Sequence, residues 1–149
     1  MNKNAELLNF VYQNSGMGII TANQILGAIE NRRLRRQIKE QQKGYSRFNK
    51  DAKSLLKKNG YMARGVSPLQ KLSSGLMIKM KTYKDSSPSH IAEIMILGSN
   101  MGIIDANRRL NHYKGADRDV RCLMRRLLEF EENNVQRLKR SFYDCSRGA

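Results

Sequence analysis

The sequence is short of the residue types that mark disulfide-stapled, secreted or membrane-spanning proteins. It has no tryptophan, two prolines and two cysteines among 149 residues. Cys122 and Cys145 are too far apart in the sequence for a CxxC or a metal-ligand spacing, so we interpret both as reduced thiols. No apolar run approaches the roughly 20 residues that a membrane-spanning helix needs, and the N-terminus lacks the apolar block of a secretory signal. We therefore expect a soluble, cytoplasmic protein.

Histidine is also scarce, which limits the enzymatic and metal chemistry available to the chain. The two histidines are His90 and His112. His90 lies three residues before Glu93 on one helical face, and we interpret this pair as a surface or capping contact. No Ser/His/Asp arrangement, phosphate-binding loop or dinucleotide-binding glycine motif is present. We assign no catalytic residue, no metal ligand and no cofactor.

Positive charge, by contrast, is abundant. Lysine and arginine number 28 against 13 aspartate and glutamate, which gives a formal net charge of +15. Such a balance favours an acidic partner, namely nucleic acid, an anionic membrane surface or an acidic protein, and it also fits a basic solvated surface. Hydrophobic residues make up 40% of the chain, which is enough for one domain with a single core.

Apolar residues recur at spacings of three and four along four long segments, which predicts four helices. We place these helices at residues 4–30, 33–58, 88–113 and 117–143. Gly60 follows the second segment as a helix stop. Pro68 and Pro88 each follow a serine and mark helix starts, so we also expect a shorter helix between residues 61 and 87.

Two segments of the chain are nearly identical. SGMGIITANQIL begins at Ser15 and SNMGIIDANRRL begins at Ser99, and they agree at eight of twelve positions without a gap. They fall in the first and third predicted helices, and LRRQIKE from Leu34 resembles LMRRLLE from Leu123 in the second and fourth. The pattern predicts one domain over residues 1–149, in which a helical hairpin is used twice. The hairpins span residues 4–59 and 88–144, and a crossover spans residues 60–87.

Each copy of the repeated segment places three small residues on one helical face. A glycine inside a helix costs roughly 1 kcal/mol relative to alanine, so glycines at matching positions need a reason. We expect close packing of the first helix against the third across a pseudo-twofold axis. The residues in this expected contact are Ser15, Gly18, Ala22, Ser99, Gly102 and Ala106.

Two hairpins joined by a long crossover form the ferritin-like topology. Over nearly its whole length the chain resembles the ferritin-like superfamily. More narrowly, it is similar to small bacterial ferritin-like domains of unknown function, whose first and third helices carry a glycine-centred segment like MGIITAN and MGIIDAN. The resemblance implies an all-α, ferritin-like four-helix bundle with a partly helical crossover.

Catalytic members of that superfamily hold two irons with a Glu from each of two helices and Glu-x-x-His from each of the other two. The corresponding positions here offer Gln42 and Tyr45 in the second helix, and Glu131 and Asn134 in the fourth. One carboxylate and no imidazole remain, which disfavours a di-iron centre. We expect the acidic cluster around Glu131 to pair with arginine instead.

Several amides near the middle of the helices suggest what fills the bundle centre. One hypothesis is a neutral polar network in place of the metals, because buried amides need partners. The alternative is that these side chains reach solvent at the flank, which we favour for Asn23 and Asn107. The set consists of Asn23, Gln41, Gln42, Tyr45, Asn107 and Asn134.

Arginines cluster at the start of the second helix, the end of the third and the start of the fourth. We expect these groups to converge at one end of the bundle and to contact anions or nucleic acid without sequence specificity. The candidates are Arg32, Arg33, Arg35, Arg36, Arg108, Arg109, Arg118, Arg121, Arg125 and Arg126.

Three functions remain open on the sequence alone. The favoured one is a non-catalytic bundle that acts by protein interaction or assembly, with itself or with an acidic protein. Non-specific nucleic-acid binding is the second, and a metal-binding oxidase with an atypical site is the third.

Overall fold

A computed structural model describes residues 2–66 and 87–147 of the chain, with side chains up to residue 140. Within these ranges the chain forms four helices and no strand. The helices are α1 (Lys3–Leu26), α2 (Arg32–Lys58), α5 (Pro88–His112) and α6 (Arg118–Arg147). The four long helices predicted from apolar periodicity are thus confirmed. The shorter helix expected within residues 61–87 falls largely on residues 67–86, which lie outside the described residues.

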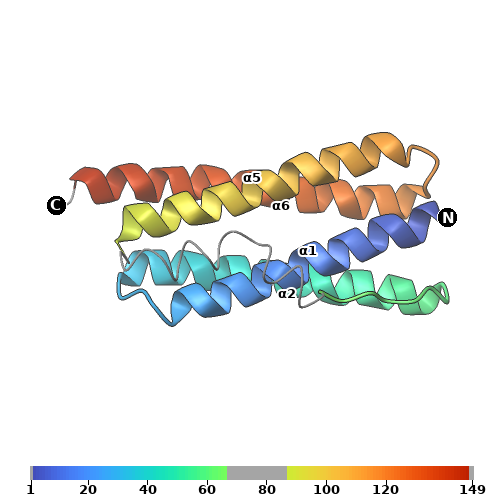
Figure 1. The fold of residues 1–149 in the computed structure, drawn as a ribbon, viewed down its shortest axis with the longest axis horizontal. Coiled ribbons are helices and arrows are strands. Elements are labelled where there is room, and N and C mark those ends of the chain that lie inside the picture. Colours follow the sequence, from blue (N-terminus) through green and yellow to red (C-terminus); the bar gives the residue numbers. More distant parts are fainter. Residues whose placement is uncertain (1, 67–86, 148–149) are drawn as a thin grey trace.

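The helices pack as two antiparallel hairpins lying side by side (Figure 1). The first hairpin joins α1 to α2 and the second joins α5 to α6, and the contacts within each hairpin are the most extensive. Between the hairpins, α6 contacts both α1 and α2, and α1 also contacts α5. The turn between α1 and α2 and the turn between α5 and α6 lie at opposite ends of the bundle (Figure 1). The start of α1 therefore lies beside the second turn, where the Asp117 backbone N–H donates to Asn4 Oδ1 at 2.8 Å.

The helix ends follow from local capping chemistry. The Ser87 hydroxyl accepts from the backbone N–H of His90, and Pro88 begins α5, as the Ser-Pro signal predicts. Gly60 has a φ of +71°, the left-handed geometry expected just after α2. At the first turn, α1 ends at Leu26 and not near residue 30, because Asn31 already caps α2 and the chain needs the residues between them to reverse direction.

Two apolar clusters fill the bundle, one towards each end. The cluster near the N-terminus is built on Leu7, Leu8, Val11, Phe48, Leu56, Met124 and Leu127. The cluster near the first turn is built on Ala22, Ile25, Ile29, Leu34, Ile38, Ile91 and Leu138. Polar side chains separate the two clusters at mid-bundle.

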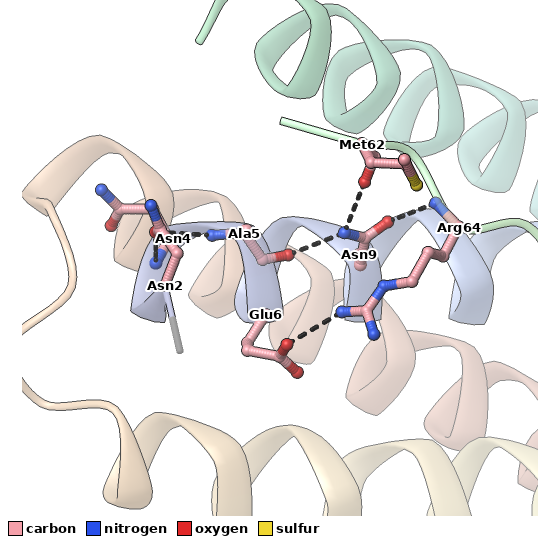
Figure 2. Close-up of polar contacts among 7 residues, drawn as sticks. All are labelled: Asn2, Asn4, Ala5, Glu6, Asn9, Met62 and Arg64. Carbon is pink, nitrogen blue, oxygen red and sulfur yellow. Dashed lines mark hydrogen bonds and ion pairs between the residues drawn. The ribbon is translucent and has the colours of Figure 1, made fainter. Parts of the chain in front are cut away.

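An extended segment after α2 is fastened to α1 by a buried asparagine (Figure 2). Asn9 is 3% exposed. Its Nδ2 donates to the carbonyl of Met62 at 3.1 Å, and its Oδ1 accepts from the backbone N–H of Arg64 at 2.7 Å. The Arg64 guanidinium also pairs with Glu6 at 2.9 Å. Asn9 therefore satisfies backbone groups that no helix or sheet partner would satisfy.

Candidate functional site

The centre of the bundle holds a polar layer, defined by Asn14, Gln41, Tyr45, Ser99, Glu131 and Asn134, to which all four helices contribute. Glu131 of α6 is only 3% exposed. The side-chain amide of Asn14 on α1 donates to Glu131 Oε1 at 3.2 Å. The hydroxyls of Tyr45 on α2 and Ser99 on α5 lie close enough to the carboxyl to act on its ionisation.

Burial dominates the electrostatics of this layer. Burial raises the pKa of Glu131, and the hydrogen-bond donors Tyr45, Ser99 and Asn14 offset part of that rise. Burial, followed by the negative charge of Glu131, raises the pKa of Tyr45 well above its usual range. The groups that donate to the Glu131 carboxylate are neutral, and no cation among the described residues compensates its negative charge.

The polar layer is incompletely hydrogen-bonded. Within the described residues, Glu131 Oε2, both polar atoms of the Gln41 side chain and Asn134 Nδ2 are buried without a partner in hydrogen-bond geometry. Each such group costs about 1–3 kcal/mol of stability. Most buried polar groups in proteins are paired, so these atoms call for an explanation.

The polar residues near mid-helix divide between the two hypotheses. Gln41, Tyr45 and Asn134 are buried, and the favoured expectation that Asn23 and Asn107 reach solvent at the flank is confirmed. Asn107 donates to the Ile103 carbonyl. Gln42 donates to Asn23 where α1 and α2 meet.

The expectation that Glu131 pairs with arginine is wrong. Its side chain is buried in the bundle, where its Oε1 accepts from the neutral amide of Asn14. The reason is its position on the face of α6 that also carries Leu127, Asn134 and Leu138, all of which are buried. The polar layer therefore contains an ionisable carboxyl group and is not made of neutral side chains alone.

A cavity of about 80 Å³ lies next to the polar layer. Its partly exposed lining residues belong to α1 and α5, so it opens between these two helices. The lining residues are Asn14, Met17, Gly18, Thr21, Tyr45, Met95, Gly98, Ser99 and Glu131.

Metal-ligating side chains are dispersed over the part of the chain that the structure describes. No group of three or more His, Cys, Asp or Glu side chains comes together there. His90 Nδ1 lies 3.8 Å from Glu93 Oε2 near the start of α5, far from Glu131. Cys122 is an exposed free thiol.

The six small residues expected between the first and third helices face different partners. A Cβ at Gly102 would lie 2.9 Å from the Asn14 side chain, so this glycine does stand where α5 meets α1. A Cβ at Gly18, however, would lie 2.6 Å from the Tyr45 ring of α2. Ser15 accepts from Asn49, also of α2, at 3.2 Å. These small residues of α1 face α2 because α2, the hairpin partner of α1, packs against α1 more extensively than any other helix does.

The remaining three small residues are buried in separate places. Ser99 faces Glu131 in the polar layer. Ala22 belongs to the apolar cluster near the first turn, and Ala106 belongs to the one near the N-terminus.

The arginine clusters do not converge as expected, because the two turns lie at opposite ends of the bundle (Figure 1). Those at the start of α2 are at one end, and those at the end of α5 and the start of α6 are at the other. The first group is Arg32, Arg33, Arg35 and Arg36; the second is Arg108, Arg109, Arg118, Arg121, Arg125 and Arg126.

Several of these arginines are engaged within the chain. Arg35 Nη1 donates to the carbonyls of Leu26 and Ile29 and so satisfies two carbonyl oxygens at and just after the end of α1. Arg109 lies over the Phe10 ring at 5.0 Å. Arg126 lies over Phe48 and contacts Asp51, and Arg108 contacts Asp105 at 3.3 Å.

The structure adds two arginines that the sequence reasoning missed. Arg137 and Arg140 of α6 join Arg33 and Arg36 of α2 around a surface hollow of about 270 Å³. We call these four arginines, together with Glu40, the basic hollow. Arg137 pairs with Glu40 at 2.6 Å, and this hydrogen bond lowers the pKa of Glu40. The feature that could have revealed these two arginines is the opposite placement of the two turns, which brings the end of α6 beside the start of α2.

Large apolar side chains are exposed along one face of α5. Leu97 is 42%, Met101 62% and Ile104 56% exposed. Their spacings of four and three put them on one helical face, and we call this set the apolar stripe. The chain has no lysine or arginine between Pro88 and Asn107, so the stripe lies on a helix without cations until its last turn.

No known protein family, curated protein or solved structure matches this chain. The features of the molecule that bear on function are the polar layer, the basic hollow and the apolar stripe. Among the described residues, no helix is long and apolar enough to cross a membrane.

Proposed function

We propose that the chain is a non-catalytic, ferritin-like assembly module that associates with a second copy of itself through the apolar stripe of α5. The ferritin-like arrangement is supported by the two antiparallel hairpins. It is also supported by the position of α5, which begins at the end of the bundle where α2 begins (Figure 1). A connection as long as residues 60–87 suits that geometry, because the end of α2 and the start of α5 lie at opposite ends of the bundle (Figure 1).

The exposed apolar stripe is the observation that carries the proposal. Isolated apolar residues on a surface are ordinary, but three large ones aligned on one helical face form a surface suited to association. Water contact over this face is unfavourable, and a partner that covers it removes that cost.

The distribution of positive charge over the chain favours α5 as the surface through which a second copy can approach. Each chain carries a net charge of +15, so most of its surfaces repel one another. On α2, 11 of 27 residues are lysine or arginine. The apolar stripe avoids this repulsion because its helix carries no cation before Arg108. Beside the stripe, Asp105 and Arg108 are exposed and can pair across an antiparallel contact.

The size of the stripe predicts a weak association. Full burial of a Leu, Ile or Met side chain contributes about 1.5–3 kcal/mol. With 42%, 62% and 56% of the three side chains exposed, burying them contributes about 3 kcal/mol per chain, or about 6 kcal/mol for a dimer. Association costs about 4–15 kcal/mol, so burial of the stripe offsets this cost only at the low end of the range, and each of its residues matters.

Sedimentation equilibrium over a range of protein concentrations tests the proposal. The full chain is expected to associate as concentration rises, and Met101→Lys to remain monomeric over the same range. Loss of the Met101 contact in both copies weakens a dimer by about 20-fold or more. Met62→Lys is the matched control, since Met62 is 81% exposed but lies outside α5. A monomeric wild-type chain, or equal association of the Met101→Lys variant, would show the proposal to be wrong.

A second candidate function is non-specific nucleic-acid binding, which the basic hollow favours. Four arginines from two helices surround it, and guanidinium groups bind phosphates in a bidentate fashion. The acid there, Glu40, is already paired with Arg137. The hollow is thus a concentrated positive surface where a phosphate backbone can lie.

Binding to duplex DNA at several salt concentrations tests this second candidate. Removing two phosphate contacts with Arg33→Gln and Arg140→Gln should lower the slope of log affinity against log salt by about two. Arg118→Gln with Arg125→Gln removes the same charge at the opposite end of the bundle and is the matched control. Equal losses in both double variants would mean that overall charge, and not the basic hollow, attracts the DNA.

A further inference from the structure

The cavity beside the polar layer contains one carboxyl oxygen that no donor among the described residues reaches in hydrogen-bond geometry. Glu131 lines the cavity, is 3% exposed, and leaves its Oε2 without a hydrogen-bond partner. Its other oxygen already accepts from Asn14. A buried carboxylate oxygen can only accept hydrogen bonds while it is ionised, so a ligand that satisfies it must donate.

The charge of the cavity sets the charge of the ligand. Among the described residues that line it, Glu131 is the single acidic residue and none is lysine, arginine or histidine. One bound positive charge would therefore neutralise the site. A divalent metal ion is a poorer match, because it would leave an excess charge buried and because Ca²⁺ and Mg²⁺ need about six or more oxygen ligands.

The volume and the walls of the cavity set the size and the chemistry of the ligand. A cavity of about 80 Å³ has room for a small ligand of several non-hydrogen atoms, since about 10–15 Å³ of accessible volume is enough for one water molecule. Met17 and Met95 contribute apolar wall, and Gly18 and Gly98, which carry no side chain, also line the cavity. Such walls suit an alkyl group better than the water shell of a metal ion.

We propose that this cavity binds a small protonated amine, with its ammonium group on Glu131 and its alkyl group between Met17 and Met95. An ammonium carries three donors. Oε2 of Glu131 accepts the first, and the hydroxyl oxygens of Ser99 and Tyr45, which line the same cavity, lie within the site to accept the others. Because the cavity is formed within a single chain, this binding does not depend on association through α5.

Methylammonium is the simplest probe, and nuclear magnetic resonance of the full chain is the readout. Titration with methylammonium chloride at constant ionic strength should shift the backbone amide signals of Gly18 and Gly98 saturably. Glu131→Gln keeps the shape of the side chain and removes its charge, so affinity should fall about tenfold or more. Glu129→Gln is the matched control, because Glu129 is an exposed residue two positions earlier on α6.

Two further titrations of the wild-type chain keep the test independent of any variant. Methanol, which is close to methylammonium in size but uncharged, should leave the same signals unshifted. Mn²⁺ should not compete with methylammonium. The proposal is overturned if methylammonium gives no saturable shift, if Glu131→Gln binds as tightly as the wild-type chain, if methanol binds equally well, or if Mn²⁺ displaces the amine.

Discussion

Replacing Gly44 by alanine tests how tightly the two hairpins are fitted together. Gly44 lies on α2, where the ring of Phe130 on α6 reaches its backbone. A Cβ at this position would lie 2.3 Å from Phe130 Cε2 and 2.5 Å from Cζ. The ring is held in place, since Phe130 packs edge-on against Tyr45 at 5.0 Å and against Phe48 at 5.3 Å between ring centroids. The added methyl group therefore has to displace either an aromatic cluster or a helix.

Two opposing effects decide the magnitude. Alanine in place of glycine inside a helix gains about 1 kcal/mol. Overpacking of a well-packed core costs about 1–3 kcal/mol, and a distance of 2.3 Å to a ring atom puts this site at the upper end of that range. We expect Gly44→Ala to lower the free energy of unfolding by about 1–2 kcal/mol.

Urea unfolding followed by far-ultraviolet circular dichroism measures this loss. Gly27→Ala is the matched control, because a Cβ there meets only two carbonyl oxygens, at 3.5 and 3.8 Å. That variant should be unchanged or slightly more stable. Phe130→Leu withdraws the ring edge and should recover part of the loss when combined with Gly44→Ala, as a coupled pair in a double-mutant cycle. If Gly44→Ala is as stable as the wild-type chain, or if the two substitutions simply add, the close fit of α2 on α6 is refuted.

Three further predictions concern single residues. Asn9→Ala removes the bonds to Met62 and Arg64, so it should lower the free energy of unfolding by about 1–3 kcal/mol and speed cleavage after Arg64 by trypsin, whereas Asn107→Ala should do neither. Gly60→Ala strains a φ of +71° and should cost about 1–2 kcal/mol in urea unfolding. Because burial raises the pKa of Glu131, the folded chain binds its proton more tightly than the unfolded chain. Stability should therefore fall as pH rises from the ordinary glutamate pKa through the folded one. Glu131→Gln should be more stable than the wild-type chain above that range and equal to it below, and an equal difference at every pH would contradict this reasoning.

The helices could be predicted from the sequence because their signals are local. Apolar spacing located all four, and the Ser87-Pro88 start and the Gly60 stop each depend on chemistry within a few residues. Asn9 escaped prediction because its partners lie more than 50 residues away, and no local pattern marks an asparagine that satisfies a distant backbone.

The relative placement of the two hairpins could have been predicted from the length of the crossover between them. A crossover over residues 60–87 is long enough to run beside a 27-residue helix, which is about 40 Å long at 1.5 Å per residue. If it does so, α5 begins beside the start of α2, and the two turns must lie at opposite ends. The expected convergence of the arginine clusters ignored this consequence. The same placement brings Arg137 and Arg140 to the start of α2.

The repeated segments show most directly why the apolar stripe needs a partner. The two copies are 84 residues apart, so Met17 corresponds to Met101 and Ile20 to Ile104. On α1 both positions are partly buried, whereas on α5 their counterparts are 62% and 56% exposed. Nearly the same sequence is therefore partly buried on α1 and leaves large apolar side chains exposed to solvent on α5. Solvation alone gives no reason to keep methionine and isoleucine at these two positions of α5, while a second copy that covers them would give both repeats equivalent surroundings.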